Sequence, residues 1–260
     1  MILIAIVGIC HAIDITIIGG EEVNPHTEPH ILSIQKQNNH CTRNNHFCGG
    51  SVISESYGIT AAHCHHSRVL AVGGVHNIHR LEPTQQRRKA EFLKHSQYNP
   101  ATLSNDIAIL KMVDEPFYFN NYLMPIIMPP QQDIEWLPHN KKVRICGWGT
   151  ISYPNHNYPS GLHCVDTKII DLEHCNDSDL YDGSVLRGMF CAGELRIGGT
   201  DSCQGDSGGP AKLDNMVVGV TSWGIGCGEK EHPGVYTDVA YYSDWVHSHT
   251  QMYDHQKTED

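Results

Sequence analysis

The sequence is short of long apolar runs and of positive charge, and both shortages limit what the protein can be. Its 260 residues contain 18 Lys and Arg against 29 Asp and Glu, a formal net charge of −11 with histidine neutral. Since Arg87-Arg88-Lys89 is the longest run of cations, the chain is not predicted to bind nucleic acid through its electrostatic field. Apart from Met1–Ala12, nothing approaches the roughly 18 apolar residues of a membrane-spanning helix.

Met1–Ala12 is similar to the leader of an exported protein. It is apolar and ends Cys10-His11-Ala12, which resembles the small-x-small pattern before a signal-peptidase cut. It is also short and lacks a positive start, so a disordered apolar stub or a wrongly assigned start is the alternative. We therefore expect a signal peptide over residues 1–12 and a secreted, extracellular protein, in which disulfides persist.

The rest of the chain has the pattern of strands. Short runs rich in Val, Ile and Thr lie between clusters of Gly, Pro and Asn, and helical periodicity is convincing only in Tyr241–Met252. There is no internal repeat and no low-complexity tract. An all-β protein with a C-terminal helix is predicted, and the proline-rich segment Pro125–Pro138 is expected to divide it.

The most informative segment is Ser202–Pro210, which reads Ser-Cys-Gln-Gly-Asp-Ser-Gly-Gly-Pro. Ser207 offers a hydroxyl that can attack a carbonyl carbon. The backbone N–H groups of Gly205 and Ser207 can both point at the oxyanion that this attack creates. Asp206 adds a carboxylate that needs a partner elsewhere. A lone Gly-Asp-Ser-Gly occurs in ordinary turns, whereas nine matched residues are a specific signal.

Two further segments complete a catalytic set in the order His, Asp, Ser. Thr60–Cys64 places His63 on a tight turn after an apolar run, and Asn105–Leu110 places Asp106 at the entry to a buried strand. This order resembles the triad of serine proteases, and the resemblance implies that His63 accepts the Ser207 proton and later returns it to the leaving amine. It also implies that Asp106 holds the imidazole tautomer and stabilises the imidazolium. One of the chain's 19 histidines could follow an apolar run by chance. Three motifs in this order would not occur by chance.

These motifs resemble those of the trypsin-like serine proteases. The resemblance runs from Ile17 to about Trp245, and its other matches are Ile17–Gly20, His46–Gly50, Gly147–Gly149, Ser222–Gly224 and Pro233–Tyr236. In detail the chain looks most like digestive trypsins of arthropods, mites included. The resemblance implies two six-stranded antiparallel Greek-key barrels with a C-terminal helix. It also implies a protease domain over residues 17–253 and a polar tail over 254–260.

Nine of the ten cysteines remain once Cys10 leaves with the leader. The resemblance implies three disulfides, Cys48–Cys64, Cys175–Cys191 and Cys203–Cys227. The first would brace the turn of His63, and the last would close the specificity pocket. Cys146 and Cys164 lie on strands expected to run antiparallel, so they could form a cross-strand bridge; two buried thiols are the alternative. The odd total leaves Cys41 as the expected unpaired thiol or intermolecular link.

Cleavage before Ile17 is the activation step that the resemblance implies. The new α-ammonium would pair with Asp206, and pairing a buried charge favours the ordered site. Since Thr16 precedes the cut, a trypsin would not make it, so an activating protease of another specificity is expected. If the leader ends at Ala12, residues 13–16 form the activation propeptide. Removal of two dipeptides by an exopeptidase, or a different true start, are the alternatives.

The resemblance also places the primary specificity pocket. Asp201 lies where the family has the floor of that pocket, so substrates with Arg or Lys before the cleaved bond are expected. Gly224 and Gly234 fit two wall positions that must lack side chains. Ser222, Trp223 and Gly224 should offer backbone groups to an extended substrate. A structural Asp201 bonded to backbone is the alternative, and the two glycines count against it.

No metal or cofactor is expected. His65-His66 follows His63 closely, but surface histidines explain the pair without a ligand geometry. Many trypsins carry paired carboxylates in the loop after residue 73. Here Gly74 and Thr84 stand at those places, and Glu82 alone supplies too few oxygens for a hard cation.

The sequence therefore predicts a secreted, monomeric serine endopeptidase, made as a zymogen, that cuts after Arg or Lys through an acyl-enzyme in a digestive setting. Protein protease inhibitors are further possible partners, and nucleic acid and membrane are not. A narrow regulatory protease is a second interpretation, because the insertion Gln37–His46 could restrict substrates. The alternative from another class is an inactive relative that acts as a binding or decoy protein. Loss of a catalytic or oxyanion residue would mark it, and none is lost.

Overall fold

The computed structural model describes residues 20–37, 45–132, 136–150, 159–195, 205–226 and 230–250. Most of these residues lie in strands or in the turns between them. The elements, in chain order, are β1 (Glu21–Glu22), β2 (Ile31–Lys36), β3 (His46–Val52), β4 (Tyr57–Thr60), the 3-10 helix η1 (Ala62–Cys64), β5 (Val69–Gly73), β6 (Gln86–Lys94), β7 (Ala108–Met112), β8 (Lys142–Gly147), β9 (His163–Ile170), α1 (Leu172–Cys175), β10 (Met189–Ala192), β11 (Pro210–Leu213), β12 (Met216–Trp223), β13 (Gly234–Asp238) and α2 (Ser243–Thr250). Within this described part, no helix is both long and apolar enough to cross a membrane.

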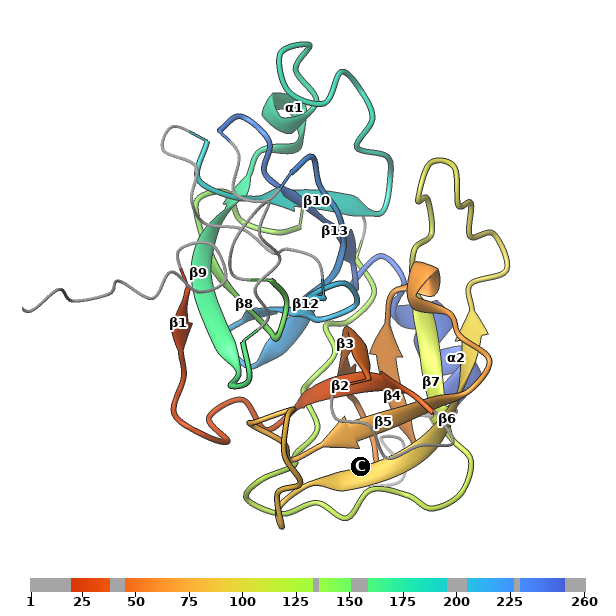
Figure 1. Cartoon of the computed structure of the whole chain (residues 1–260). Coiled ribbons are helices and arrows are strands. Elements are labelled where there is room, and N and C mark those ends of the chain that lie inside the picture. The colour runs from red at the N-terminus through yellow and green to blue at the C-terminus, as the bar shows by residue number, and fades with distance from the viewer. Residues whose placement is uncertain are drawn as a thin grey trace, which may run out of the picture.

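Strands β2 to β7 close into the first barrel, in the order β2-β3-β4-β7-β6-β5, with every neighbouring pair antiparallel. It is the lower barrel in Figure 1. Its interior is filled by fully buried aliphatic side chains, among them Leu32, Ile34, Ile59 and Leu110. Gly58 leaves room for this packing, because a Cβ there would lie 2.9 Å from the Ser51 carbonyl oxygen.

Strands β8 to β13 form the second barrel, the upper one in Figure 1. The order is β8-β9-β10-β13-β12-β11, and β8 closes the ring because it pairs with both β9 and β11. Strand β1 adds to the outside of β9, with Glu21 opposite Cys164. Residues 113–132 and 136–141 lie between β7 of the first barrel and β8 of the second, and they include the described part of the predicted boundary. The prediction of two six-stranded antiparallel barrels is confirmed.

Helix α2 packs against the first barrel, although it follows the second in sequence (Figure 1). Tyr242 and Val246 belong to the same buried cluster as Leu110. The helix covers most of the stretch predicted from periodicity, whose last two residues lie outside the described part. Helix α1 was not predicted. Its four residues are too few to show a period, and Asp171 caps it by accepting the His174 N–H.

Three disulfides join the described strands and turns. Cys48–Cys64 and Cys175–Cys191 have Cα atoms 6.2 and 6.5 Å apart, and both pairs are those that the resemblance implied. Cys146 and Cys164 lie directly opposite each other on β8 and β9 and are bonded, so the cross-strand bridge replaces the alternative of two thiols. Cys41, Cys203 and Cys227 lie outside the described residues.

Candidate active site

His63 and Asp106 meet at the edge of the first barrel. His63 lies on η1, which the Cys48–Cys64 disulfide ties to β3. Its Nδ1 is 2.7 Å from Asp106 Oδ2, and its backbone N–H donates to Asp106 Oδ1 at 2.8 Å. Asp106 is completely buried, whereas the His63 side chain is 25% exposed. The carboxylate therefore fixes both the ring and the backbone of a histidine that solvent and substrate can reach.

The second barrel holds Asp106 from the other side. The Ser222 hydroxyl on β12 donates to Asp106 Oδ2 at 2.6 Å, and the Thr237 hydroxyl on β13 donates to its backbone oxygen at 2.8 Å. The sequence predicts for Ser222 only a backbone role toward substrate and gives no sign of this hydroxyl contact. No sequence signal could have found this contact, because only the docking of the two barrels brings residues 116 positions apart together.

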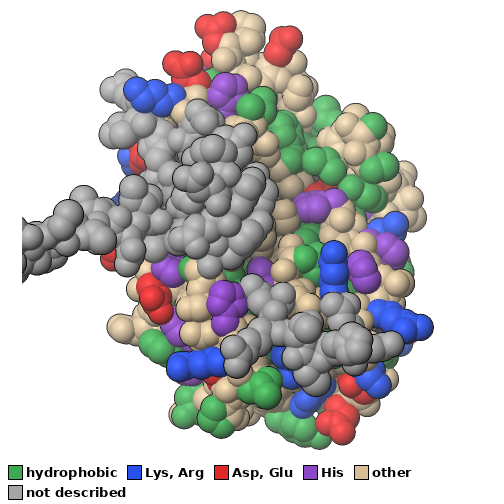
Figure 2. Space-filling model, viewed as in Figure 1, with side chains coloured by type: hydrophobic (Ala, Val, Ile, Leu, Met, Phe, Trp, Pro, Cys, Tyr) green, Lys and Arg blue, Asp and Glu red, His purple; other side chains and the backbone are tan. Residues whose placement is uncertain are grey.

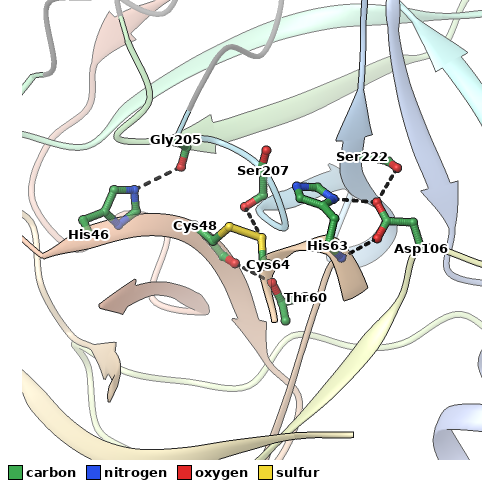
Figure 3. Close-up of a disulfide and its surroundings, with 10 residues drawn as sticks. His46, Cys48, Thr60, His63, Cys64, Asp106, Gly205, Ser207 and Ser222 are labelled. Carbon is green, nitrogen blue, oxygen red and sulfur yellow. Dashed lines mark hydrogen bonds and ion pairs between the residues drawn. A yellow bond between two sulfur atoms is a disulfide. The ribbon is translucent and has the colours of Figure 1, made fainter. Parts of the chain in front are cut away.

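Ser207 stands in the turn that leads into β11. The Gly49 N–H on β3 donates to its backbone oxygen at 2.8 Å, which ties this turn to the first barrel. Figure 3 shows the imidazole ring of His63 between Ser207 and the Asp106 carboxylate. Such an arrangement can pass a proton from a serine hydroxyl to an imidazole whose other nitrogen faces a carboxylate.

Gly205 is positioned by the half-buried His46, which also contacts the buried Ser33. His46 Nε2 lies 3.0 Å from the Gly205 oxygen, and His46 Nδ1 lies 2.9 Å from Ser33 Oγ (Figure 3 shows the first contact). Burial lowers the pKa of His46 to about 4, so the ring is neutral near pH 7 and can donate from one nitrogen only. Gly205 has φ of 101°, a conformation that favours glycine. The residue expected to supply an oxyanion N–H is thus locked in place.

Asp206 is completely buried against the Gly147-Trp148-Gly149 segment. The Gly149 N–H donates to its Oδ1 at 2.8 Å. A Cβ on Gly147 would lie 2.0 Å from Asp206 Oδ1, and one on Gly149 would lie 2.4 Å from Oδ2. Both glycines are therefore needed for this carboxylate to fit. Thr16 and Ile17, the expected activation residues, lie outside the described part of the chain.

The pocket residues lie on two paired strands. Ser222 and Trp223 end β12, Gly224 follows them, and Gly234 begins β13. Trp223 is opposite Val235 in the β12–β13 pairing and packs edge-on against another aromatic ring, Tyr181, with centroids 5.0 Å apart. Asp201, the expected floor, lies outside the described residues.

In the loop from Gly74 to Thr84, Glu82 is the one acidic residue, and it is already bonded within the protein. The Glu82 carboxylate accepts the His76 N–H at 2.6 Å and lies 3.5 Å from the Arg80 guanidinium, so it is committed to the protein. At the place of an expected carboxylate, Gly74 has φ of 68°, and a Cβ there would lie 2.5 Å from the Thr84 oxygen.

Comparison with known proteins gives one family. The family model described as Trypsin matches residues 17–246. Trypsin-3 of Salmo salar is 37% identical over 236 residues, which cover 90% of this chain and 93% of the relative. Serine protease 1 of Homo sapiens is 37% identical, and Cationic trypsin-3 of Rattus norvegicus is 36% identical, each over 234 residues that cover 90% of this chain and 89% of the relative. The matched region contains both barrels and His63, Asp106 and Ser207.

Proposed function

Because the chain belongs to the trypsin family of serine endopeptidases, we propose that Ser207 is its nucleophile, His63 its general base and Asp106 the carboxylate that orients the base. The observation that carries this proposal is the 2.7 Å contact between His63 Nδ1 and Asp106, with Ser207 on the far side of the ring (Figure 3). The Nδ1 proton is then held by Asp106, which leaves Nε2 free to take a proton.

The proposed reaction proceeds through an acyl-enzyme. Ser207 Oγ attacks the carbonyl carbon of the substrate while its proton moves to His63, and the N–H groups of Gly205 and Ser207 bind the oxyanion. His63 returns the proton to the leaving amine as the peptide C–N bond breaks. Water then attacks the Ser207 ester with His63 again as base. The acid is released and the serine hydroxyl is restored.

The proposed substrates are proteins and peptides with Arg or Lys before the cleaved bond. Asp201 would supply the negative charge for the substrate cation, a charge-assisted contact that favours Arg and Lys. Gly224 and Gly234, without side chains, would leave a path for a long substrate residue. Protein protease inhibitors that present a basic residue would occupy the same pocket, and the enzyme would act as a monomer.

We propose that the protein is synthesised and exported as a zymogen. A signal peptide over residues 1–12 would be removed first, and a protease of other specificity would then cut between Thr16 and Ile17. The freed ammonium would pair with Asp206, whose burial makes a cationic partner favourable. We assign the active domain to residues 17–253, with residues 254–260 as a polar tail. A digestive role, as in arthropod trypsins, completes the proposal.

The experiment that tests this function is a panel of peptides that differ only at the residue before the cleaved bond. The full chain is made with residues 13–16 replaced by the recognition sequence of an added protease, so that cleavage frees Ile17. Peptides with Arg, Lys, Phe or Ala are then compared. We expect fast cleavage confined to Arg and Lys, its loss in Ser207→Ala, and a weaker preference for basic residues in Asp201→Ser.

No cleavage of any peptide by a folded protein with a free Ile17 amine would overturn the proposal and favour the inactive binding paralogue. Equal cleavage by Ser207→Ala would remove that residue as nucleophile. Retained Arg selectivity in Asp201→Ser would remove Asp201 from the pocket.

A further inference from the structure

A part of this acidic chain is almost free of acidic residues. From Pro29 to Leu81, Glu55 is the one acidic residue, although the whole chain has 29. On the face in Figure 2, acidic side chains gather at the top, whereas most visible Lys and Arg side chains lie over the lower barrel. The charge that a substrate meets therefore differs from one barrel to the other.

Four exposed or half-buried residues of the first barrel gather beside the Cys48–Cys64 disulfide, and we call Lys36, Phe47, His66 and Arg68 the leaving-side patch. Lys36 Nζ lies 5.4 Å from the centroid of the Phe47 ring, and the His66 ring packs against the same ring at 6.0 Å. The Arg68 N–H donates to His66 Nδ1 at 3.4 Å, and its carbonyl accepts an N–H from the residue after Lys36 at 3.0 Å. Two cations, an imidazole and an aromatic ring therefore share one surface.

The cations of this patch are not neutralised by the described residues. In the part of the chain that the structure places, Lys36 and Arg68 form no ion pair, although both are exposed. Three cations of the second barrel differ, since Arg144, Lys168 and Lys212 each pair with a carboxylate. An unpaired cation on an exposed surface is available to a partner.

The patch lies on the side of the site from which the leaving amine departs. In the proposed function, the substrate residues before the cleaved bond run along Ser222–Gly224. Figure 3 shows Ser222 next to Asp106 on one side of His63, and the Cys48–Cys64 disulfide on the other side, below Ser207, whose backbone oxygen lies 3.6 Å from Cys64 Sγ. Phe47 directly precedes Cys48 in β3. An extended chain that continues past Ser207 therefore passes over the disulfide to the patch.

We propose that the leaving-side patch binds an acidic side chain at one of the first two residues after the cleaved bond. This inference rests on the proposed function and adds a second specificity to it. Lys36 and Arg68 attract the carboxylate, and the face of Phe47 supports its aliphatic carbons. Because these cations are exposed, each contributes little, and we expect a preference of about five- to tenfold that weakens as salt screens it.

The test uses three quenched fluorescent peptides with the same residues up to an Arg before the cleaved bond. The two residues after that bond are both Ala, both Asp or both Lys. With the activated full chain at about 0.02 M salt, we expect kcat/KM for Asp to exceed that for Lys about five- to tenfold. The ratio should fall toward one at about 0.5 M salt and in the double variant Lys36→Gln, Arg68→Gln.

Lys142→Gln is the matched control, because it removes one exposed cation from β8, outside the patch, and should leave the ratio unchanged. A ratio near one in the unmodified enzyme, or an equal fall in Lys142→Gln, overturns the inference. The Ala peptide separates the two proposals. If it is not cut, the proposed function fails. If it is cut but Asp and Lys are cut equally, only the patch fails.

Discussion

Two buried carboxylates, Asp106 and Glu28, connect the first half of the chain to the second barrel. Their hydrogen-bond and ion-pair partners differ in kind. Asp106 receives a backbone N–H, a serine hydroxyl and an imidazole. Within the described residues, neither Lys nor Arg contacts it. Glu28 is 6% exposed and pairs with Lys212 on β11 and with Arg144 on β8, whose Nε lies 3.2 Å from Oε1. The first carboxylate has neutral donors and a titratable partner, and the second has permanent cations.

The difference separates a chemical site from a structural one. In the proposed mechanism, a positive charge appears on His63 during the reaction, and Asp106 can stabilise it because no permanent cation among the described residues already neutralises the carboxylate. Around Glu28, the charges are satisfied before any reaction begins, so the cluster can only hold the second barrel to the segment before β2. Burial is nearly the same in the two regions, and the type of partner decides what each can do.

Removing the negative charge of Asp106 should change activity more than any other substitution considered below. Asp106→Asn keeps the shape but presents an amide to His63 Nδ1, which favours the wrong tautomer. We expect kcat to fall about 10⁴-fold, the loss known for this change in a related serine protease, while the protein stays folded. Hydrolysis of an Arg peptide by the activated chain measures it, with Asp166→Asn, an exposed carboxylate, as control. A loss below tenfold would show that His63 does not depend on this carboxylate.

Removing the Glu28 carboxylate should lower stability rather than activity. Glu28→Ala leaves Lys212 and Arg144 without their shared carboxylate, so the free energy of unfolding should fall by about 3 kcal/mol. This is the low end for a broken buried pair, because Arg144 is 40% exposed and keeps Asp166 at 3.5 Å. Urea unfolding at pH 7 measures the loss, and kcat should stay within about twofold of the unmodified enzyme.

A double variant, Glu28→Leu with Lys212→Met, serves as the matched control for that prediction. It removes both members of the pair, so it should recover most of the lost stability, since replacing a buried pair with apolar side chains is often neutral. If Glu28→Ala costs less than about 0.5 kcal/mol, the range of ordinary surface changes, the cluster does not hold the barrels together.

Whether the sequence could predict a contact depends on how far apart its two residues lie along the chain. The motifs around His63, Asp106 and Ser207 are local and lie in the expected order, so the fold and the candidate site could be named from them. The Cys146–Cys164 bridge was also within reach, because two neighbouring antiparallel strands place those residues opposite each other.

Contacts between distant segments could not be predicted in the same way. Glu28 meets Lys212 across 184 positions, and no periodic pattern marks either residue. The Ser222 hydroxyl reaches Asp106 for the same reason. Both contacts depend on how two barrels dock, which hydrophobic patterning within one strand does not specify. Sequence alone therefore predicts which groups would react, but not the residues that hold them.

The stability of the region around Glu28 should depend on pH. His30 lies 3.8 Å from Glu28, and burial, with Lys212 as a second cause, lowers its pKa from 6.5 to about 3. Below pH 6.5 the unfolded chain binds a proton that the folded chain does not, so stability is lost as the pH falls through this window. From pH 6.5 to 4.5 we expect His30 to account for a loss of about 2 to 3 kcal/mol. Burial of His46, with its pKa of about 4, adds a loss in the same direction.

Urea unfolding of His30→Phe between pH 7 and 4.5 measures the His30 share. This variant should lose about 2 kcal/mol less than the unmodified protein over that range. His174→Gln, which changes a histidine with a 56% exposed side chain, should follow the unmodified protein. An unchanged slope in His30→Phe would assign the acid sensitivity to another group, with His46 the first to examine. The Glu28 region would then owe its stability to its permanent cations alone.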